Sequence, residues 1–464
     1  MKPLSWVIGM LVCLAAASVA GCKREQSQPA ASSSPRVAAT STVLATLSAT
    51  DLKPETGGTA PGHAGAASSG QGGESTILFS ELGGGVAYIA QQNGNSHLVL
   101  NGQAGKGYEE IDQNYVLSRD GRHVVYAVKV KGKWRMVADG VEGVEFDTVG
   151  TPRISLDGKH TLYDAQRGDR WFLVVDGALN GGAPSYFDKN FINDSSKLVY
   201  IENVAGDDGM HRVIISDLSF GKLFGKDLRV ENTIYNEDKS RMAVVAGIGA
   251  KKQLVVVDLE NPGTVNEGAL YDEISFPTFS PDGKITAYFA RKEGKRYLVL
   301  NGKEEVLPDG EVGEAPAVSP DLKGGGVILK TNKGFYLHRA GGGEELSSPR
   351  YEEAALLSFS RVGDSYAYVA RNGKKMFYVI NGKSSPPFDR ALAPAFTPDG
   401  KQIVGRVRKE GKRFVVVIDG GGRVVQQHPD YEMVFNPVFT SDGKFVAYGV
   451  KDGTRLAWKV EKLP

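Results

Sequence analysis

The first candidates for metal binding or catalysis are aspartates that recur immediately before glycine, as in the stretch Phe-Ser-Pro-Asp-Gly-Lys that begins at Phe279. Five of them have similar surroundings: Asp120, Asp157, Asp282, Asp399 and Asp442. A calcium loop needs several oxygen ligands close together, whereas each of these aspartates stands alone in its stretch. Proline, aspartate and glycine in this order suit the successive positions of a tight turn. The pattern therefore predicts turns and not calcium sites.

Histidine, cysteine and serine also lack the spacing that metal binding or nucleophilic catalysis needs. No two histidines between residues 75 and 464 stand at zinc-ligand spacing. The only cysteines are Cys13 and Cys22, so the rest of the chain has no thiol for a disulfide, a metal or a nucleophile. No Gly-x-Ser-x-Gly elbow occurs either. The sequence predicts no catalytic residue, no metal and no cofactor, and therefore a protein that is not an enzyme.

The first 21 residues are typical of a signal peptide. Lys2 gives a basic start, and the apolar run from Leu4 to Ala20 is too short and too rich in alanine for a comfortable membrane span. The run ends in Val19-Ala20-Gly21-Cys22, which resembles the lipobox of bacterial lipoproteins. The resemblance implies that the Cys22 thiol carries a diacylglycerol. A plain secretory signal with an incidental cysteine is the alternative.

The resemblance also suggests a location. Asp directly after the lipidated cysteine resembles a retention signal for the inner membrane, and this chain has Lys23 there. We therefore expect a lipid anchor in the bacterial cell envelope, in the outer membrane and facing the periplasm. Residues 22–74 are mostly Ala, Ser, Gly, Thr and Pro. Such a composition buries too little to fold, and it predicts a disordered tether.

Residues 75–464 repeat one pattern about ten times with a period of roughly 40 residues. Each copy has a short run ending in an apolar residue, a turn, a strand with a small and an aromatic residue, a charged hairpin, and an apolar strand ending at Asn-Gly or Asp-Gly. A weaker segment with acidic and aromatic residues, such as Tyr271 to Ser275, is interpreted as the fourth strand; the last copy has no clear one. The clearest copies start at Phe279, Phe359, Phe396 and Phe439, and weaker ones start near Phe79, Leu117, Ile154, Ile192, Tyr235 and Val318.

Four short strands per period and no convincing helix predict an all-β protein, a β-propeller of about ten four-stranded repeats. One large ring and two five-bladed rings both fit the repeat number. The pattern Phe-Ser-Pro-Asp-Gly-Lys followed by Ala-Tyr (Phe279 to Tyr288) resembles the WD-repeat-like, TolB-type propellers of bacterial envelope proteins. This resemblance covers residues 75–464 and implies a fold more than a function.

The charges of the chain nearly cancel, with 55 Lys and Arg against 54 Asp and Glu, so no nucleic-acid partner is predicted. The hairpin between the second and third strands is repeatedly basic, while acidic residues are expected in the outermost strands. All such hairpins leave a propeller on the same face. We hypothesise that this face docks an envelope protein or an anionic surface; the alternative is that the charges only keep strand edges soluble. The residues expected to contribute are Lys295, Arg296, Lys374, Lys375, Lys412 and Arg413.

Together these features predict a membrane-anchored, non-enzymatic propeller scaffold that binds a protein partner in the bacterial cell envelope. The alternative is a small-ligand sensor or an enzyme that uses the central channel, where pockets commonly form in this architecture.

Overall fold

The structure is a computed structural model that describes residues 40–47, 77–193, 195–206, 209–322, 324–340 and 351–464. Every described residue lies in one compact unit, residues 38–464. Within these residues all regular structure is β-strand, in 43 strands. Accordingly, no described segment is a helix long and apolar enough to span a bilayer. The signal peptide 1–21, Cys22 and most of the expected tether lie outside the described residues.

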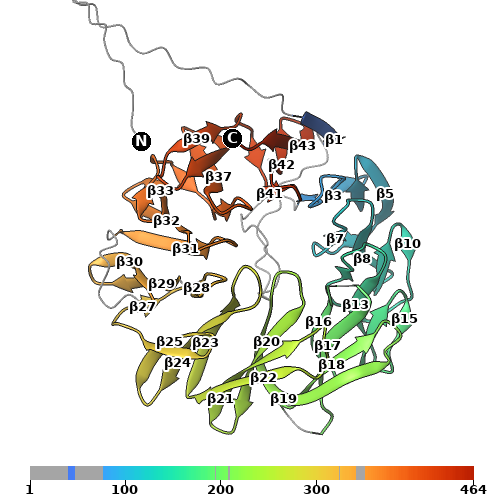
Figure 1. Cartoon of the computed structure of the whole chain (residues 1–464). Helices are drawn as coiled ribbons and strands as arrows, with labels where there is room; N and C mark the ends of the chain where they lie inside the picture. The colour runs from blue at the N-terminus through green and yellow to red at the C-terminus, as the bar shows by residue number, and fades with distance from the viewer. Residues whose placement is uncertain (1–39, 48–76, 194, 207–208, 323, 341–350) are drawn as a thin grey trace, which may run out of the picture. The chain divides into compact units, whose positions relative to one another are not determined.

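The strands form nine antiparallel sheets, and the seven-stranded one contains two repeat units because its strand β19 belongs to both. The described residues therefore hold ten units, here called blades 1 to 10 in chain order (Figure 1). Each blade has an innermost strand and a second and a third strand joined by a hairpin, and every blade except blade 7 also has an outermost strand among the described residues. This confirms the predicted all-β propeller of about ten repeats. The strand before the turn ends at the residue where the copy was predicted to start in every blade except blade 4, where β16 ends at Phe191, one residue before Ile192.

Blades 1 to 5 occupy residues 78–271. Blade 1 contains β2 (Leu78–Phe79), β3 (Val86–Gln92), β4 (Asn95–Leu100) and β5 (Gln103–Tyr108). Blade 2 contains β6 (Glu110–Ile111), β7 (Val116–Leu117), β8 (Val124–Val130), β9 (Lys133–Ala138) and β10 (Val141–Glu142). Blade 3 contains β11 (Thr148–Val149), β12 (Arg153–Ile154), β13 (Thr161–Arg167), β14 (Arg170–Val175) and β15 (Ala178–Leu179). Blades 4 and 5 share β19 (Lys222–Tyr235), with β16 (Tyr186–Phe191), β17 (Lys197–Asn203) and β18 (His211–Asp217) before it and β20 (Arg241–Ile248), β21 (Lys251–Asp258) and β22 (Val265–Tyr271) after it.

Blades 6 to 10 occupy residues 273–462, and blade 10 takes one further strand from the amino-terminal part. Blade 6 contains β23 (Glu273–Phe279), β24 (Thr286–Lys292), β25 (Lys295–Leu300) and β26 (Lys303–Val306). Blade 7 contains β27 (Glu311–Val312), β28 (Ala317–Val318), β29 (Gly325–Thr331) and β30 (Gly334–Arg339). Blade 8 contains β31 (Glu353–Phe359), β32 (Tyr366–Asn372), β33 (Lys375–Ile380) and β34 (Lys383–Ser384). Blade 9 contains β35 (Arg390–Ala391), β36 (Ala395–Phe396), β37 (Gln402–Lys409), β38 (Lys412–Asp419) and β39 (Val424–Gln427). Blade 10 contains β40 (Met433–Val434), β41 (Val438–Phe439), β42 (Phe445–Asp452), β43 (Arg455–Lys462) and β1 (Thr40–Thr46).

The middle strands are apolar on both faces because every blade packs between two others. Along β20, Met242 and Val244 face a cluster shared with blade 4, whereas Ala243 and Val245 face one shared with blade 6. This alternation follows from the two-residue period of a strand. The described residues form ten such clusters, one for each pair of neighbouring blades including blades 10 and 1. The blades therefore close as one ring and not as two five-bladed rings.

The innermost strand is interrupted in several blades, usually at a proline. Pro152, Pro316, Pro394 and Pro437 each lie between the two short strands of an innermost position. Proline has no backbone N–H to donate to the neighbouring strand, so the hydrogen-bonded ladder breaks there. The interruption divides the blade wall that faces the centre of the ring.

The closing strand β1 corrects the expected tether. Residues 40–46 lie inside the segment 22–74 that was predicted to be disordered, yet they pair antiparallel with β43, from Thr40 opposite Val460 to Thr46 opposite Arg455 (Figure 1). They supply the outermost strand that the last copy appeared to lack. The prediction is wrong for residues 40–47 because Ala45 and Leu47 enter the cluster between blades 10 and 1. The rest of the segment, residues 22–39 and 48–74, lies outside the described residues.

The acidic segments also differ from the expectation. The stretch from Tyr271 to Ser275 was interpreted as a fourth strand, but β23 begins at Glu273 and is the innermost strand of the next blade. The observed fourth strand comes earlier, soon after the third strand: β22 ends at Tyr271, and β26 directly follows the Asn301-Gly302 turn. The acidic residues therefore lie on the connection between blades, at the end of the ring where the basic hairpins also lie.

Candidate functional site

The Asp-Gly turns are built as the sequence predicted. In blade 2 the Ser118 hydroxyl donates to Asp120 at 2.6 Å, and the backbone N–H of Arg122 donates to the same carboxylate oxygen at 3.1 Å. The hydrogen bond from Ser118, followed by that from the Arg122 backbone, holds the pKa of Asp120 below its ordinary value. The carboxylate thus serves its own turn. Within the described residues, no group of three histidine, cysteine or acidic side chains is placed to hold a metal ion.

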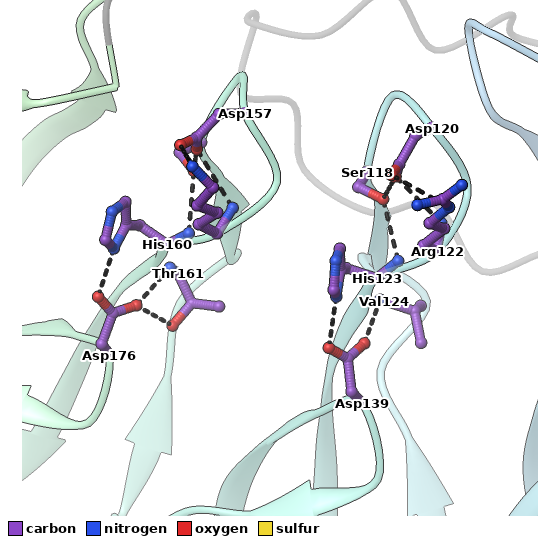
Figure 2. A network of polar contacts seen from close by, with 12 residues as sticks. Ser118, Asp120, Arg122, His123, Val124, Asp139, Asp157, His160, Thr161 and Asp176 are labelled. Carbon is purple, nitrogen blue, oxygen red and sulfur yellow. Dashed lines mark hydrogen bonds and ion pairs between the residues drawn. The ribbon is translucent and has the colours of Figure 1, made fainter.

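Two histidine–aspartate pairs occupy equivalent positions in neighbouring blades (Figure 2). His123 Nδ1 lies 2.7 Å from an oxygen of Asp139, whose other oxygen accepts the backbone N–H of Val124 at 2.8 Å. His160 and Asp176 repeat the arrangement in blade 3, also at 2.7 Å. Sequence analysis missed both pairs. The signal was a histidine directly before the second strand in two copies whose third strand ends at Asp-Gly.

Each aspartate of these pairs is the first residue of the turn between the third and outermost strands. Asn101 and Asn381 fill this position in blades 1 and 8 and accept the equivalent backbone N–H from Val86 and Tyr366. The carboxylate therefore accepts a backbone N–H that helps to close the blade, and in blades 1 and 8 an asparagine amide oxygen accepts the equivalent N–H. The additional histidine contact orients the imidazole but adds no nucleophile. These pairs fit a structural role better than a catalytic one.

A third histidine is buried where blades 9 and 10 meet. The side chain of His428 is fully buried and its Nδ1 contacts one oxygen of Glu461, while the Tyr448 hydroxyl donates to the other oxygen at 2.8 Å. Burial, followed by the nearby Glu461 carboxylate, raises the pKa of Tyr448 above its ordinary value, so this hydroxyl keeps its proton. Glu461 occupies the strand position where other copies begin their Asn-Gly or Asp-Gly turn. The polar cluster replaces that turn at the end of the chain.

The basic hairpins are paired with the acidic residues of the connections between blades. Lys375 lies 2.5 Å from Asp389, and the other oxygen of Asp389 accepts the hairpin N–H of Glu410 at 2.6 Å. Asp272 makes the same two contacts with Lys251 and the N–H of Glu293. The hydrogen bond from Lys375 lowers the pKa of Asp389. These exposed pairs hold the hairpins in place and neutralise much of the charge that the docking hypothesis invoked.

The six predicted docking residues lie on hairpins of blades 6, 8 and 9. Arg296 donates to the carbonyl oxygens of Gly310 at 2.6 Å and Pro308 at 3.1 Å, and Arg413 donates to the carbonyl of Glu432. Two of the lysines, Lys375 and Lys412, pair with carboxylates, the latter with Asp430 at 3.5 Å. The remaining two, Lys295 and Lys374, are exposed and make no ion pair with any described residue. Docking through this face stays a prediction.

Comparison with known proteins adds similarities of fold. No protein-family model matches the chain, and no curated protein matches it. Among solved structures, a eukaryotic initiation factor is 12% identical, with 79% of this chain and 90% of that chain covered and a TM-score of 0.43. TolB from Acinetobacter baumannii is 18% identical over 61% of this chain and 81% of its own, with a TM-score of 0.29. The Cps50 (Swd1) β-propeller domain of Myceliophteria thermophila is 13% identical over 55% and 92%, with a TM-score of 0.31.

Proposed function

We propose that the protein is a lipid-anchored, non-enzymatic scaffold that binds a protein partner in the bacterial cell envelope. The lipid is attached to Cys22, and the propeller faces the periplasm from the outer membrane. The observation that carries this proposal is the place of β1 in the fold. The strand that closes the ring is also the strand next to the segment bearing Cys22, so the scaffold is attached to its anchor at the point of closure.

The length of the intervening chain supports a surface-bound ring. Seventeen residues lie between Cys22 and Thr40, and such a chain spans at most about 60 Å when fully extended. An anchor at Cys22 would therefore keep blade 10 close to the bilayer. A ring of similar blades also offers repeated contact positions on one surface, which suits the binding of a large partner better than the conversion of a small substrate.

Membrane attachment is tested by replacing Cys22 with serine. We expect the Cys22→Ser protein to leave the membrane fraction, whereas Cys13→Ser, a change within the same leader, should leave fractionation as in the parent. Partner binding is tested by crosslinking intact envelopes and purifying the full-length protein. Membrane retention of Cys22→Ser, or the absence of any crosslinked protein, would contradict the proposal.

The docking hypothesis for the hairpin face is tested with the two unpaired lysines. If the hairpin face docks the partner, reversal of Lys295 and Lys374 to glutamate will weaken the envelope crosslinks and flatten their salt dependence, because exposed charges act over about 8 Å at physiological salt. The melting temperature should stay nearly unchanged, since neither side chain is buried. Crosslinks that respond to salt as in the parent would mean that the hairpins are only a solvated edge.

A further inference from the structure

The opposite end of the ring is formed by the turns between innermost and second strands, here called the turn face. The turns of neighbouring blades pack closely against one another. A Cβ added at Gly121 would lie 2.3 Å from the backbone nitrogen of Gly85 in the preceding blade, and one at Gly400 would lie 2.3 Å from the hydroxyl of Ser360. The Asp157 backbone N–H of blade 3 donates to Ser195 of blade 4 at 3.2 Å. Side chains on these turns therefore gather around the mouth of the ring.

Several charged side chains of the turn face are paired across blades. Arg119 of blade 2 contacts Glu81 of blade 1 at 2.6 Å. Arg361 of blade 8 contacts Glu237 of blade 5, although two blades separate them in the sequence. The turns of distant blades thus meet at this end, and both of these pairs are neutral overall.

Two other cations at this end have no carboxylate in an ion pair among the described residues: Arg153, on the innermost strand of blade 3, and Lys239, in the turn of blade 5. Arg153 donates to the carbonyl oxygen of Pro152 at 3.3 Å. The nearby Asp188 carboxylate accepts the Thr233 hydroxyl at 3.2 Å. Burial, followed by the Arg153 guanidinium, lowers the pKa of Lys239, while Asp188 and Glu81 act in the opposite direction.

Lys239 occupies a position that most other copies give to glycine. Its N–H donates to the carbonyl of Asn236 at 3.1 Å, just as the N–H of Gly283 donates to Ser280 and that of Gly121 to Ser118. Its φ of 56° lies in the left-handed region, where glycine is unstrained and a lysine is not. The turn does not need this side chain for its geometry. The lysine therefore replaces the better turn residue and adds a half-buried positive charge.

The same turns expose apolar side chains. Leu82 in blade 1, Leu156 in blade 3 and Val362 in blade 8 are 66%, 47% and 58% exposed. Leu156 is only three residues from Arg153. The turn face thus combines two cations that form no ion pair among the described residues with apolar contact positions, whereas the hairpin face has most of its cations paired.

We infer that the turn face is the docking surface, and that Arg153 and Lys239 bind carboxylates of an acidic, extended segment of the partner protein, with Leu82, Leu156 and Val362 contacting its apolar residues. This inference rests on the proposed scaffold function and names the surface and the chemistry that it uses. Charge complementarity selects the occupant, because a carboxylate supplies the ion-pair partner that both cations lack.

The test measures the binding of a fluorescein-labelled hexaglutamate peptide to the full-length protein in detergent micelles, by fluorescence anisotropy at low and high salt. We expect Arg153→Gln and Lys239→Gly each to weaken binding by about tenfold or more, because each removes a charge-assisted hydrogen bond. Lys239→Gly introduces the residue that most of the other turns use, so its melting temperature should be nearly that of the parent. The control Lys295→Gln/Lys374→Gln changes the same kind of charge on the hairpin face and should bind like the parent.

Three results would overturn the inference: no binding of hexaglutamate by the parent at low salt, equal binding of hexalysine, or an equal loss of affinity in the Lys295→Gln/Lys374→Gln control. The scaffold proposal fails separately. If envelope crosslinks form but do not depend on Arg153 and Lys239, the protein is a scaffold that uses another surface. If hexaglutamate binds through these cations but no envelope protein crosslinks, the carboxylate-binding site is supported and the scaffold proposal is contradicted.

Discussion

Replacement of Leu47 by alanine should detach the strand that closes the ring. Leu47 is 4% exposed and packs in the cluster between blades 10 and 1, with Val86 and Leu456 among its neighbours. Truncation of a buried leucine costs about 3 kcal/mol, which includes the cavity that remains. Because β1 is otherwise largely exposed, we expect this loss to appear as local opening of β1 and only weakly in the global melting temperature.

Hydrogen exchange measures this opening directly. A loss of about 3 kcal/mol corresponds to roughly a hundredfold larger population of the open state, so the amides of β43 that pair with β1 should exchange about a hundredfold faster. Val43 provides the matched control, since it lies on the same strand and is 54% exposed; Val43→Ala should change exchange by no more than a few fold. If Leu47→Ala protects β43 as well as the parent does, β1 does not close the ring.

Two further predictions concern the turns and the acid response. Gly283→Ala should destabilise the protein by about 1–3 kcal/mol more than Gly294→Ala, because both positions have positive φ but only the new Cβ at 283 would meet another group, the amide of Asn236 at 2.3 Å; equal melting temperatures would contradict this. Hydrogen bonds to Glu142, the strongest of them from Lys106, lower the pKa of its carboxyl to about 2. Glu142 should therefore stabilise the fold above pH 4.5 and lose this contribution as the pH falls toward 2. Melting of parent and Glu142→Gln should therefore differ most at neutral pH and converge in acid; curves that stay parallel down to pH 2 would refute it.

The blades were predictable because their signals are local. A turn such as Ser280-Pro281-Asp282-Gly283 depends on residues within five positions of one another, as the bonds from Ser280 to Asp282 and from the N–H of Ile285 to Ser280 show. The repetition of such a turn identifies each innermost strand independently. The period then predicts the architecture, and errors in one copy do not spread to the others.

The closing strand was missed because its partner lies at the other end of the chain. Composition predicted disorder around Thr40, and the contact that orders β1 joins it to Val460. Two signals were nevertheless present in the sequence. The last copy had no clear fourth strand, and the stretch Thr-Ser-Thr-Val-Leu-Ala-Thr carries β-branched residues that favour strands.

The charged surfaces were hard to predict for a different reason. The sequence showed basic hairpins and acidic connections but not that the connection enters at the same end of the blade, where Asp389 meets Lys375. A compositional charge argument counts residues, whereas a surface potential depends on which of them are paired. The hairpin face therefore has less free charge than its lysines suggest.

In a repeat protein the residues that build the fold recur in most copies. The positions that inform on function are therefore those where one copy carries a different residue that is less favourable for the local conformation. Lys239 is such a position, because glycine suits its φ of 56° better and is what most equivalent turns carry; Ser195 and Leu322 depart in the same way but bring no charge. Asp120 and Ser118, by contrast, are repeated because they build the turn. A residue that every blade shares serves the blade, and a residue that one blade keeps against the local preference needs a reason outside the blade. The unpaired cation at Lys239 meets this criterion, whereas the paired lysines of the hairpins do not.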